Sequence, residues 1–341
     1  MISMFRQYLS VVLQPWLFAL LFMVTIVAGC DGPPAPPSTF PVRIRVGYLP
    51  VSTTLPNWIA ASHGYAKRYG IDIDFIRYAN SDLLLIGLLN GDIDATSVCA
   101  DEPILAAVDK GKSGFEVYLQ EILTPDRVFD AIIVSTDSAI DSLKDLEGRT
   151  LACFPGNQLK KYAHIILNAA GVDADKVTII QLPPANMLPS LSAGSVDACF
   201  ALEPIITIGT ARGVSRILEP SPIVRYIGNG ESICAASFLI STAWADANPQ
   251  AADDFVRSVY ESISFIETNY IEASVVYPEF SAIPEDLAQS VAITRFATID
   301  APDLIGMQTE ATVLHQAGIL QTTPDVKSLF YRWRVEGLKS N

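Results

Sequence analysis

The chain has 341 residues, half of them hydrophobic and 18% charged, with a formal net charge of −14 at pH 7. This length and apolar content predict a globular protein with a large core and about two domains. The acidic charge and the lack of a lysine and arginine cluster exclude a nucleic-acid surface, because phosphate binding requires concentrated positive charge.

The N-terminus has the order of a secretory signal. Arg6 precedes a long apolar run that ends in the small residues of VAGC, at positions 27–30. A basic start, an apolar middle and a small-residue cleavage site are typical of such signals. VAGC resembles the lipobox of bacterial lipoproteins, which implies that residues 1–29 are removed and Cys30 is lipidated. An uncleaved membrane anchor and an ordinary signal peptide are the alternatives.

The segment after the cleavage site, residues 30–42, is dense in proline and glycine and predicts a tether between lipid and domain. Asp31, directly after the lipidated cysteine, resembles a signal that retains lipoproteins at the inner membrane of Gram-negative bacteria. We therefore expect the domain on the periplasmic, extracytoplasmic face of that membrane, anchored through Cys30.

From residue 43, strand and helix patterns alternate, which predicts a sheet with parallel strands and covering helices. The strands are expected at RIRVGYLP (43–50), IDIDFIRY (71–78) and DIDATSV (92–98). The helices are expected at LPNWIAASHGYAKRYG (55–70), NSDLLLIGLLNG (80–91) and ILAAVDKG (104–111), the last opened by Pro103.

A second series of the same kind begins near residue 128. Its strands are expected at VFDAIIVS (128–135), RTLACF (149–154) and KVTIIQL (176–182), and its helices at SLKDLEG (142–148), GNQLKKYAHIILNAAG (156–171) and NMLPSLSAG (186–194). The last part is expected to be mostly helical and to brace the first lobe, over 249–270, 284–296, 303–318 and 325–333.

Two stretches, NGDIDATSVCADEPI (90–104) and AGSVDACFALEPI (193–205), occupy the same stage of the two series. In each, a helix ends at glycine, a strand carries Asp-Ala, and Glu-Pro opens the next helix. The strand aspartates, Asp94 and Asp197, are expected to accept backbone N–H bonds and to be structural.

The cysteines and histidines indicate no metal site. Cys99, Cys153, Cys199 and Cys234 lie in apolar surroundings without CxxC spacing, so they are either small buried hydrophobes or include a Cys153–Cys199 disulfide. The three histidines form no HxxxH or HExxH pattern, and the GxGxxG and GxxxxGK[ST] motifs are absent. We therefore expect no metal and no cofactor.

Several segments in fixed order resemble one family. They are VGYLP, GYAKRYGIDIDF, LLLIGLLNGDIDA, SAIDSLKDLEGRTLACFPG, AAGVDADKVTIIQLPPANMLPSLSAGSVDACFALEPI and LISTAWADANPQ, within about residues 43–300. They are similar to the substrate-binding proteins of ABC importers that take nitrate, sulfonates, taurine or thiamine-pyrimidine precursors.

The resemblance implies an α/β, two-lobed periplasmic binding protein fold of type II, with two crossing strands between the lobes. It implies lobe 1 at 43–130 plus 236–335 and lobe 2 at 131–235, with a ligand in the cleft and lobes that close on it. The implied partners are a small-molecule ligand and an ABC permease in the membrane, and the implied state is a monomer. The alternatives are a receptor for a membrane sensor and a pyrimidine-precursor enzyme on the same fold, although that enzyme's cysteine-rich segment is absent.

Ligands of open α/β sheets bind outside the carboxyl ends of the strands, where helix N-termini favour anionic or polar groups. The candidate ligand-binding residues in such loops are Ser52, Thr53, Thr54, Trp58, Asp101, Glu102, Gly156, Asn157, Gln158, Glu203 and Glu231. For each, a structural role as helix cap, core residue or dipole partner is the alternative. Glu203 is the preferred acidic candidate, because the resemblance implies a ligand-facing acid at that place.

Two features of these candidates bear on the ligand. Many members of the resembled family have Gly-Ser or Gly-Thr where this chain has Gly-Asn-Gln at 156–158, which argues against a simple nitrate or sulfonate clamp. The candidates are hydroxyls, amides and carboxylates without an arginine, which favours a neutral or nitrogen-containing heterocycle, such as a pyrimidine or flavin precursor.

Overall fold

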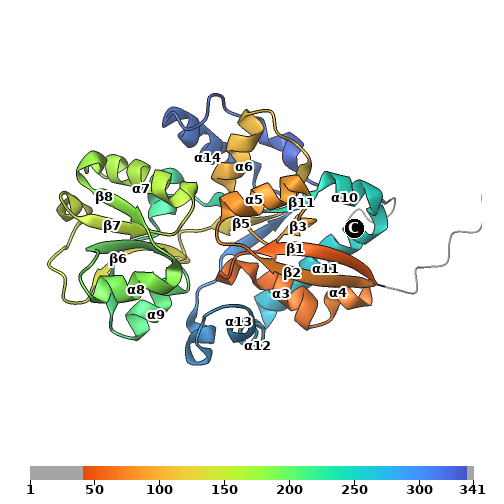
Figure 1. The fold of residues 1–341 in the computed structure, drawn as a ribbon, viewed down its shortest axis with the longest axis horizontal. Helices are drawn as coiled ribbons and strands as arrows, with labels where there is room; N and C mark the ends of the chain where they lie inside the picture. Colours follow the sequence, from red (N-terminus) through yellow and green to blue (C-terminus); the bar gives the residue numbers. More distant parts are fainter. Residues whose placement is uncertain (1–40, 336–341) are drawn as a thin grey trace, which may run out of the picture. The chain divides into compact units, whose positions relative to one another are not determined.

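The computed structural model describes residues 41–335, which form two β-sheets covered by helices (Figure 1). The predicted signal at 1–29, the lipidation at Cys30, the retention signal at Asp31 and nearly all of the tether lie outside the described residues. None of the helices in the described part combines the length and the apolar composition needed to cross a membrane.

The first sheet, sheet A, contains seven strands of the described chain in the order β12-β5-β11-β3-β1-β2, with β4 also paired to β11. Its strands are β1 (Val42–Tyr48), β2 (Ile71–Arg77), β3 (Ala95–Thr96), β4 (Cys99–Ala100), β5 (Phe115–Leu123), β11 (Ile233–Ser241) and β12 (Arg295–Thr298). β1 runs parallel to β2 and β3, whereas β11 is antiparallel to β3, β4 and β5.

The second sheet, sheet B, repeats this arrangement in the order β10-β6-β9-β7-β8. Its strands are β6 (Asp130–Ser135), β7 (Thr150–Cys153), β8 (Thr178–Gln181), β9 (Ala198–Leu202) and β10 (Ser215–Pro220). β7 runs parallel to β8 and β9, and β6 is antiparallel to β9. Lobe 1 below means sheet A with its helices, and lobe 2 means sheet B with its helices.

Two connections join the lobes. The chain leaves β5 through residues 124–129 to become β6, and it returns from β10 through residues 221–232 to become β11. The entering strand β6 pairs antiparallel with β9 of sheet B, and the returning strand β11 pairs antiparallel with β3 of sheet A. This topology confirms the predicted two-lobed α/β periplasmic binding protein fold.

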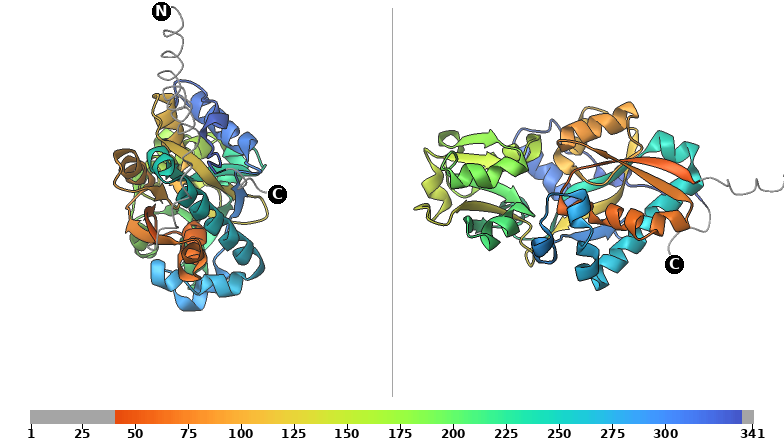
Figure 2. Two further views of the ribbon diagram at one scale, coloured as in Figure 1. Left: turned by 90° about the vertical axis from the view of Figure 1, so that its right-hand side faces the viewer. Right: turned by 60° about the horizontal axis from the view of Figure 1, so that its bottom comes forward.

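Helices cover both faces of each sheet (Figure 2). In lobe 1 they are α3 (Leu55–Ser62), α4 (Tyr65–Arg68), α5 (Ser81–Asn90), α6 (Asp101–Asp109), α10 (Thr242–Ala247), α11 (Pro249–Thr268), α12 (Tyr270–Ser274), α13 (Tyr277–Phe280) and α14 (Leu304–Gln316). In lobe 2, α7 (Asn157–Ala169) packs on one face of sheet B, and α8 (Pro184–Ser192) and α9 (Ile205–Ala211) pack on the other.

Four predicted elements differ from the structure. The expected helix at 55–70 is two helices, because Gly64 adopts a left-handed conformation with φ 74° between α3 and α4. The expected strand at 92–98 is reduced to β3, since the chain turns after it and pairs with β11 a second time as β4.

The expected helices at 284–296 and 325–333 were also wrong. They contain only the short 3₁₀ turns Glu285–Ser290 and Val326–Leu329. Part of each segment pairs with β5, the first as the strand β12 and the second as a bridge between Phe330 and Val117. Backbone pairing at this edge overrides the local helical pattern.

The two strand aspartates hold equivalent places in the lobes, as predicted. Asp94 accepts hydrogen bonds from the Arg45 backbone N–H at 2.9 Å and from the Arg45 guanidinium at 2.7 Å. Asp197 accepts a bond from the Thr150 backbone N–H at 2.8 Å. Each carboxylate bonds to the middle one of the three parallel strands of its sheet, β1 or β7.

All four cysteines of the described part have free thiols and are buried. Cys153 and Cys199 lie on the paired strands β7 and β9 without forming the alternative disulfide. They therefore act as small core residues.

We expect Asp94→Ala to lower the free energy of unfolding by about 2 kcal/mol, because it removes a buried charged acceptor of a backbone N–H. Denaturant unfolding of the purified protein measures the change. The matched variant Asp197→Ala should cost less, since the Asp197 side chain is 34% exposed and that of Asp94 only 8%. Equal costs for the two variants would contradict this account.

Candidate ligand-binding site

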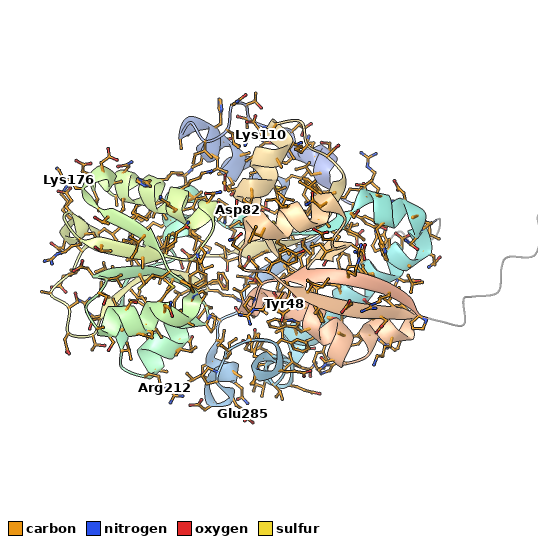
Figure 3. The ribbon with its side chains drawn as sticks, viewed as in Figure 1. Tyr48, Asp82, Lys110, Lys176, Arg212 and Glu285 are labelled. Carbon is orange, nitrogen blue, oxygen red and sulfur yellow. The ribbon has the colours of Figure 1, made fainter. Side chains whose placement is uncertain are left out.

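A cavity of about 1040 Å³ lies between the two lobes, and we call it the interlobe cavity. Its walls are built from segments that follow strands of both sheets: 48–51 after β1, 77–82 after β2, 154–159 after β7 and 183–189 after β8. Figure 3 labels Tyr48 and Asp82 where lobe 1 faces lobe 2. This is the place that α/β sheets use for ligands, and the volume matches a small organic molecule.

Most of the lining is apolar. Aliphatic, aromatic and proline side chains come from both lobes, including Leu49, Val51, Phe129, Phe154, Pro183, Leu188, Leu202, Ile205, Ile208 and Phe280. Among the described lining residues, the charged side chains are Arg77, Asp82, Glu121 and Glu279. The cavity therefore suits a ligand with an apolar body and few polar groups.

Four of the sequence candidates line this cavity: Thr53, Gly156, Asn157 and Gln158. Gly156 has φ 116°, and a Cβ atom there would lie 3.4 Å from the Asp82 carboxylate. Only a glycine lets the start of α7 approach lobe 1 this closely without backbone strain.

Asn157 and Gln158 connect the lobes as well as lining the cavity. The Asn157 backbone N–H and side-chain amide donate to the Asp82 carboxylate at 3.1 and 2.9 Å. The Gln158 side chain accepts from the Glu102 backbone N–H at 2.9 Å and donates to the Ala235 carbonyl at 3.0 Å. The first turn of α7 is thus bonded to lobe 1 and to the returning strand.

The other candidates lie outside the lining: Ser52, Thr54, Trp58, Asp101, Glu102, Glu203 and Glu231. Thr54 donates to the Leu49 carbonyl, and Glu203 accepts hydrogen bonds from the N–H and hydroxyl of Thr207. Glu231 is exposed on the connection back to lobe 1.

Trp58 is fully buried behind the lining. It stacks on Phe280 with ring centroids 5.3 Å apart and contacts the edge of Tyr48. Because Phe280 and Tyr48 line the cavity, Trp58 supports the aromatic wall from the core side.

Asp101 and Glu102, at the start of α6, belong to a buried acidic group between the lobes. Lys161 of α7 forms an ion pair with Glu102, whose side chain is 2% exposed. Tyr162 donates a hydrogen bond to Glu310 of α14, and the Cys234 thiol donates to Asp101. Burial raises the pKa of Asp101 to about 6 and that of Glu310 well above its usual value.

Two further carboxyl groups are buried near the cavity. Burial raises the pKa of Glu121, in β5, to about 8, against the opposing effect of the Thr294 hydroxyl. It also raises the pKa of Asp130, at the start of β6, to about 7, although Asp130 accepts a bond from the Ile223 N–H. At neutral pH these groups hold protons that the unfolded chain releases.

The sequence analysis missed three lining features. The candidate set contained no arginine, yet Arg77 lines the cavity, and the strand-end rule would have found it had it been applied to IDIDFIR. Glu121 lies within β5, a strand that the sequence analysis did not predict. The segment 279–282 reaches the cavity from far along the chain, and no local signal indicates it.

Comparisons with known proteins agree with this architecture. A model of the NMT1-like family matches residues 38–276. A putative aliphatic sulfonates-binding protein of Bacillus subtilis (strain 168) is 23% identical over 81% of this chain and 81% of its own length. The nitrate/nitrite binding protein NrtA of Nostoc sp. is 24% identical over 66% of this chain and 54% of its own length.

Among solved structures, the alkanesulfonate-binding protein SsuA from Xanthomonas axonopodis pv. citri, bound to MOPS, shares the fold. Its TM-score is 0.70 at 20% identity, over 86% of this chain and 100% of that one. The nitrate-binding protein NrtA from Synechocystis PCC 6803 has a TM-score of 0.65 at 18% identity, over 84% of each chain.

The buried acids predict that the protein is more stable in mild acid. Their pKa values lie above those of the unfolded chain, so the free energy of unfolding should fall as the pH rises from about 4.5 to 8. Each group contributes at most about 1.4 kcal/mol per pH unit within its own window. Urea unfolding at several pH values across this range measures the change in the free energy of unfolding. The variant Glu121→Gln should show a smaller decrease of that free energy with rising pH. A stability that rises over the same range would refute the prediction.

The ion pair between the lobes gives another prediction. Lys161→Met leaves the buried Glu102 carboxylate without its cation, so we expect a loss of about 2–3 kcal/mol of stability and a larger radius of gyration in solution scattering. The adjacent, exposed Lys160→Met is the matched control and should change neither quantity. Adding Glu102→Gln to Lys161→Met should restore part of the loss, because it removes the unpaired charge.

Proposed function

Because the chain belongs to the NMT1-like family, we propose that it is the solute-binding component of an ABC importer, which captures a small molecule between its lobes and delivers it to a membrane permease. In this role the protein is a monomer that binds its ligand and releases it chemically unchanged. The relatives named above as sulfonate- and nitrate-binding proteins support this role.

One observation carries the proposal: a single cavity of about 1040 Å³ is walled by both lobes, and these are joined by two connections. A ligand that touches both walls favours the arrangement in which the lobes are together, since it gains contacts there that separated lobes cannot offer. The hydrogen bonds from Asn157 and Gln158 to lobe 1 would be made and broken with that movement.

We also propose that the protein works outside the cytoplasm, held to the inner membrane by lipid on Cys30. The sequence VAGC at 27–30 and the Pro-rich segment after it support this location. A solved relative is described as a periplasmic aliphatic sulphonate binding protein. A receptor that presents its ligand to a membrane sensor would use the same cavity and movement. The gene neighbourhood separates the two roles: genes for a permease and an ATPase beside the gene of this protein would favour import.

A thermal-shift screen of the purified protein against nitrate, sulfonates, pyrimidines and riboflavin tests the function. A ligand at a concentration of 100 times its Kd should stabilise the folded protein by about 2.7 kcal/mol and so raise the melting temperature. Mass spectrometry should then recover the ligand chemically unchanged. Ala185→Trp should abolish the shift, because Ala185 lines the cavity at the start of α8.

Ala211→Trp is the matched control, since Ala211 is exposed at the end of α9 and outside the lining, and it should keep the shift. If no ligand of any class stabilised the protein, or if one were chemically converted, the binding-protein proposal would fail.

A further inference from the structure

One side chain in the interlobe cavity is not explained by the fold. Glu121 lines the cavity from β5 and is only 4% exposed. Its Oε1 atom is buried and has no hydrogen-bond partner among the described residues. The other ionisable lining residues named above, Arg77, Asp82 and Glu279, are exposed or half-buried, so Glu121 is the buried carboxyl group of the cavity lining.

A buried carboxyl group that has one hydroxyl, that of Thr294, as its neighbouring donor is poorly satisfied, and native proteins keep few such groups. The described structure offers Glu121 no cation: the charged groups that act on it are the carboxyls of Asp101 and Asp130, and both disfavour its ionised form. Its neighbours on the paired strands, Ala236 and Phe296, carry no charge. The missing partner is therefore to be sought in what fills the cavity.

The donors that the start of α7 could offer to an oxyanion are engaged. The Asn157 N–H and amide already bond to Asp82, and the Gln158 amide bonds to the Ala235 carbonyl. The N-terminal end of α7 thus already holds a carboxylate, as helix N-termini favour. Arg77, whose guanidinium makes no ion pair within residues 41–335, is exposed.

We propose that Glu121 anchors an organic amine: a ligand with an apolar body and an ammonium or amidinium group whose N–H bonds the Glu121 carboxylate. The proposal rests on the solute-binding function and narrows its ligand class. The apolar walls contact the body of the ligand, and the buried carboxylate selects the cationic end, since charge-assisted hydrogen bonds are the stronger kind. Nitrate and small sulfonates lack both features.

The test measures binding to the full-length protein by calorimetry. The probes are 2-phenylethylamine, isoamylamine and 4-aminopyrimidine, with 2-phenylethanol, 3-phenylpropionate, methanesulfonate and nitrate as comparisons. The amines should bind at least tenfold more tightly than the alcohol, the acid and the anions. Glu121→Gln should weaken amine binding about 10- to 100-fold. Glu272→Gln, which removes an exposed carboxylate outside the cavity lining, should stay within about twofold.

Two further measurements separate binding from folding. Glu121→Gln should melt no lower than the unmodified protein, and Glu121→Asp, which keeps the charge on a shorter side chain, should bind amines with intermediate affinity. Calorimetry in buffers of different ionisation enthalpy should show proton release from Glu121 on amine binding near pH 7, and none from the Gln variant.

The outcomes distinguish the two proposals. One outcome contradicts the amine anchor alone: nitrate or methanesulfonate binds, Ala185→Trp abolishes that binding, and Glu121→Gln leaves it unchanged. In that case the solute-binding function stands. Amines that bind equally to the Gln variant also overturn the anchor. If no probe in this panel or in the wider ligand screen binds, both proposals fail.

Discussion

The bonds between the first turn of α7 and lobe 1 are the interaction on which the rest of the site depends. Asp82, Glu102 and the Ala235 carbonyl lie on lobe 1 or on the returning strand, and each meets a polar group from Asn157 or Gln158. These bonds help to fix the separation between the two walls of the cavity. Gly156 allows the contact, because a larger residue there would strain the backbone.

The same region explains why so many acids are buried here. Asp101, Glu102 and Glu310 surround the junction of α6, α7 and α14, and lobe 2 contributes the lysine and the tyrosine that bond to them. Each lobe alone would leave part of this group unsatisfied, which is costly inside a protein. The acids therefore make the contact between the lobes specific as well as stable.

The sequence predicted the βαβ series, the two lobes and the role of Asp94 and Asp197, because local periodicity and strand-end chemistry determine these features. It failed at 284–296 and 325–333, where pairing with β5 decides the structure. For the site, Thr53 and residues 156–158 could be found from loops after strands. Glu121 could not, because its burial arises only when β5 pairs with β11 on one side and with β12 on the other.

Trp58 has a consequence for experiments on this protein. Its ring is fully buried and stacks on Phe280, and Phe280 in turn lines the interlobe cavity. An indole in such an apolar, rigid setting emits at short wavelength, and a shift of Phe280 changes the stacking directly. The contribution of Trp58 to the intrinsic fluorescence, which adds to those of Trp244 and Trp333, thus reports on occupancy of the cavity through a residue outside its lining, without any attached dye.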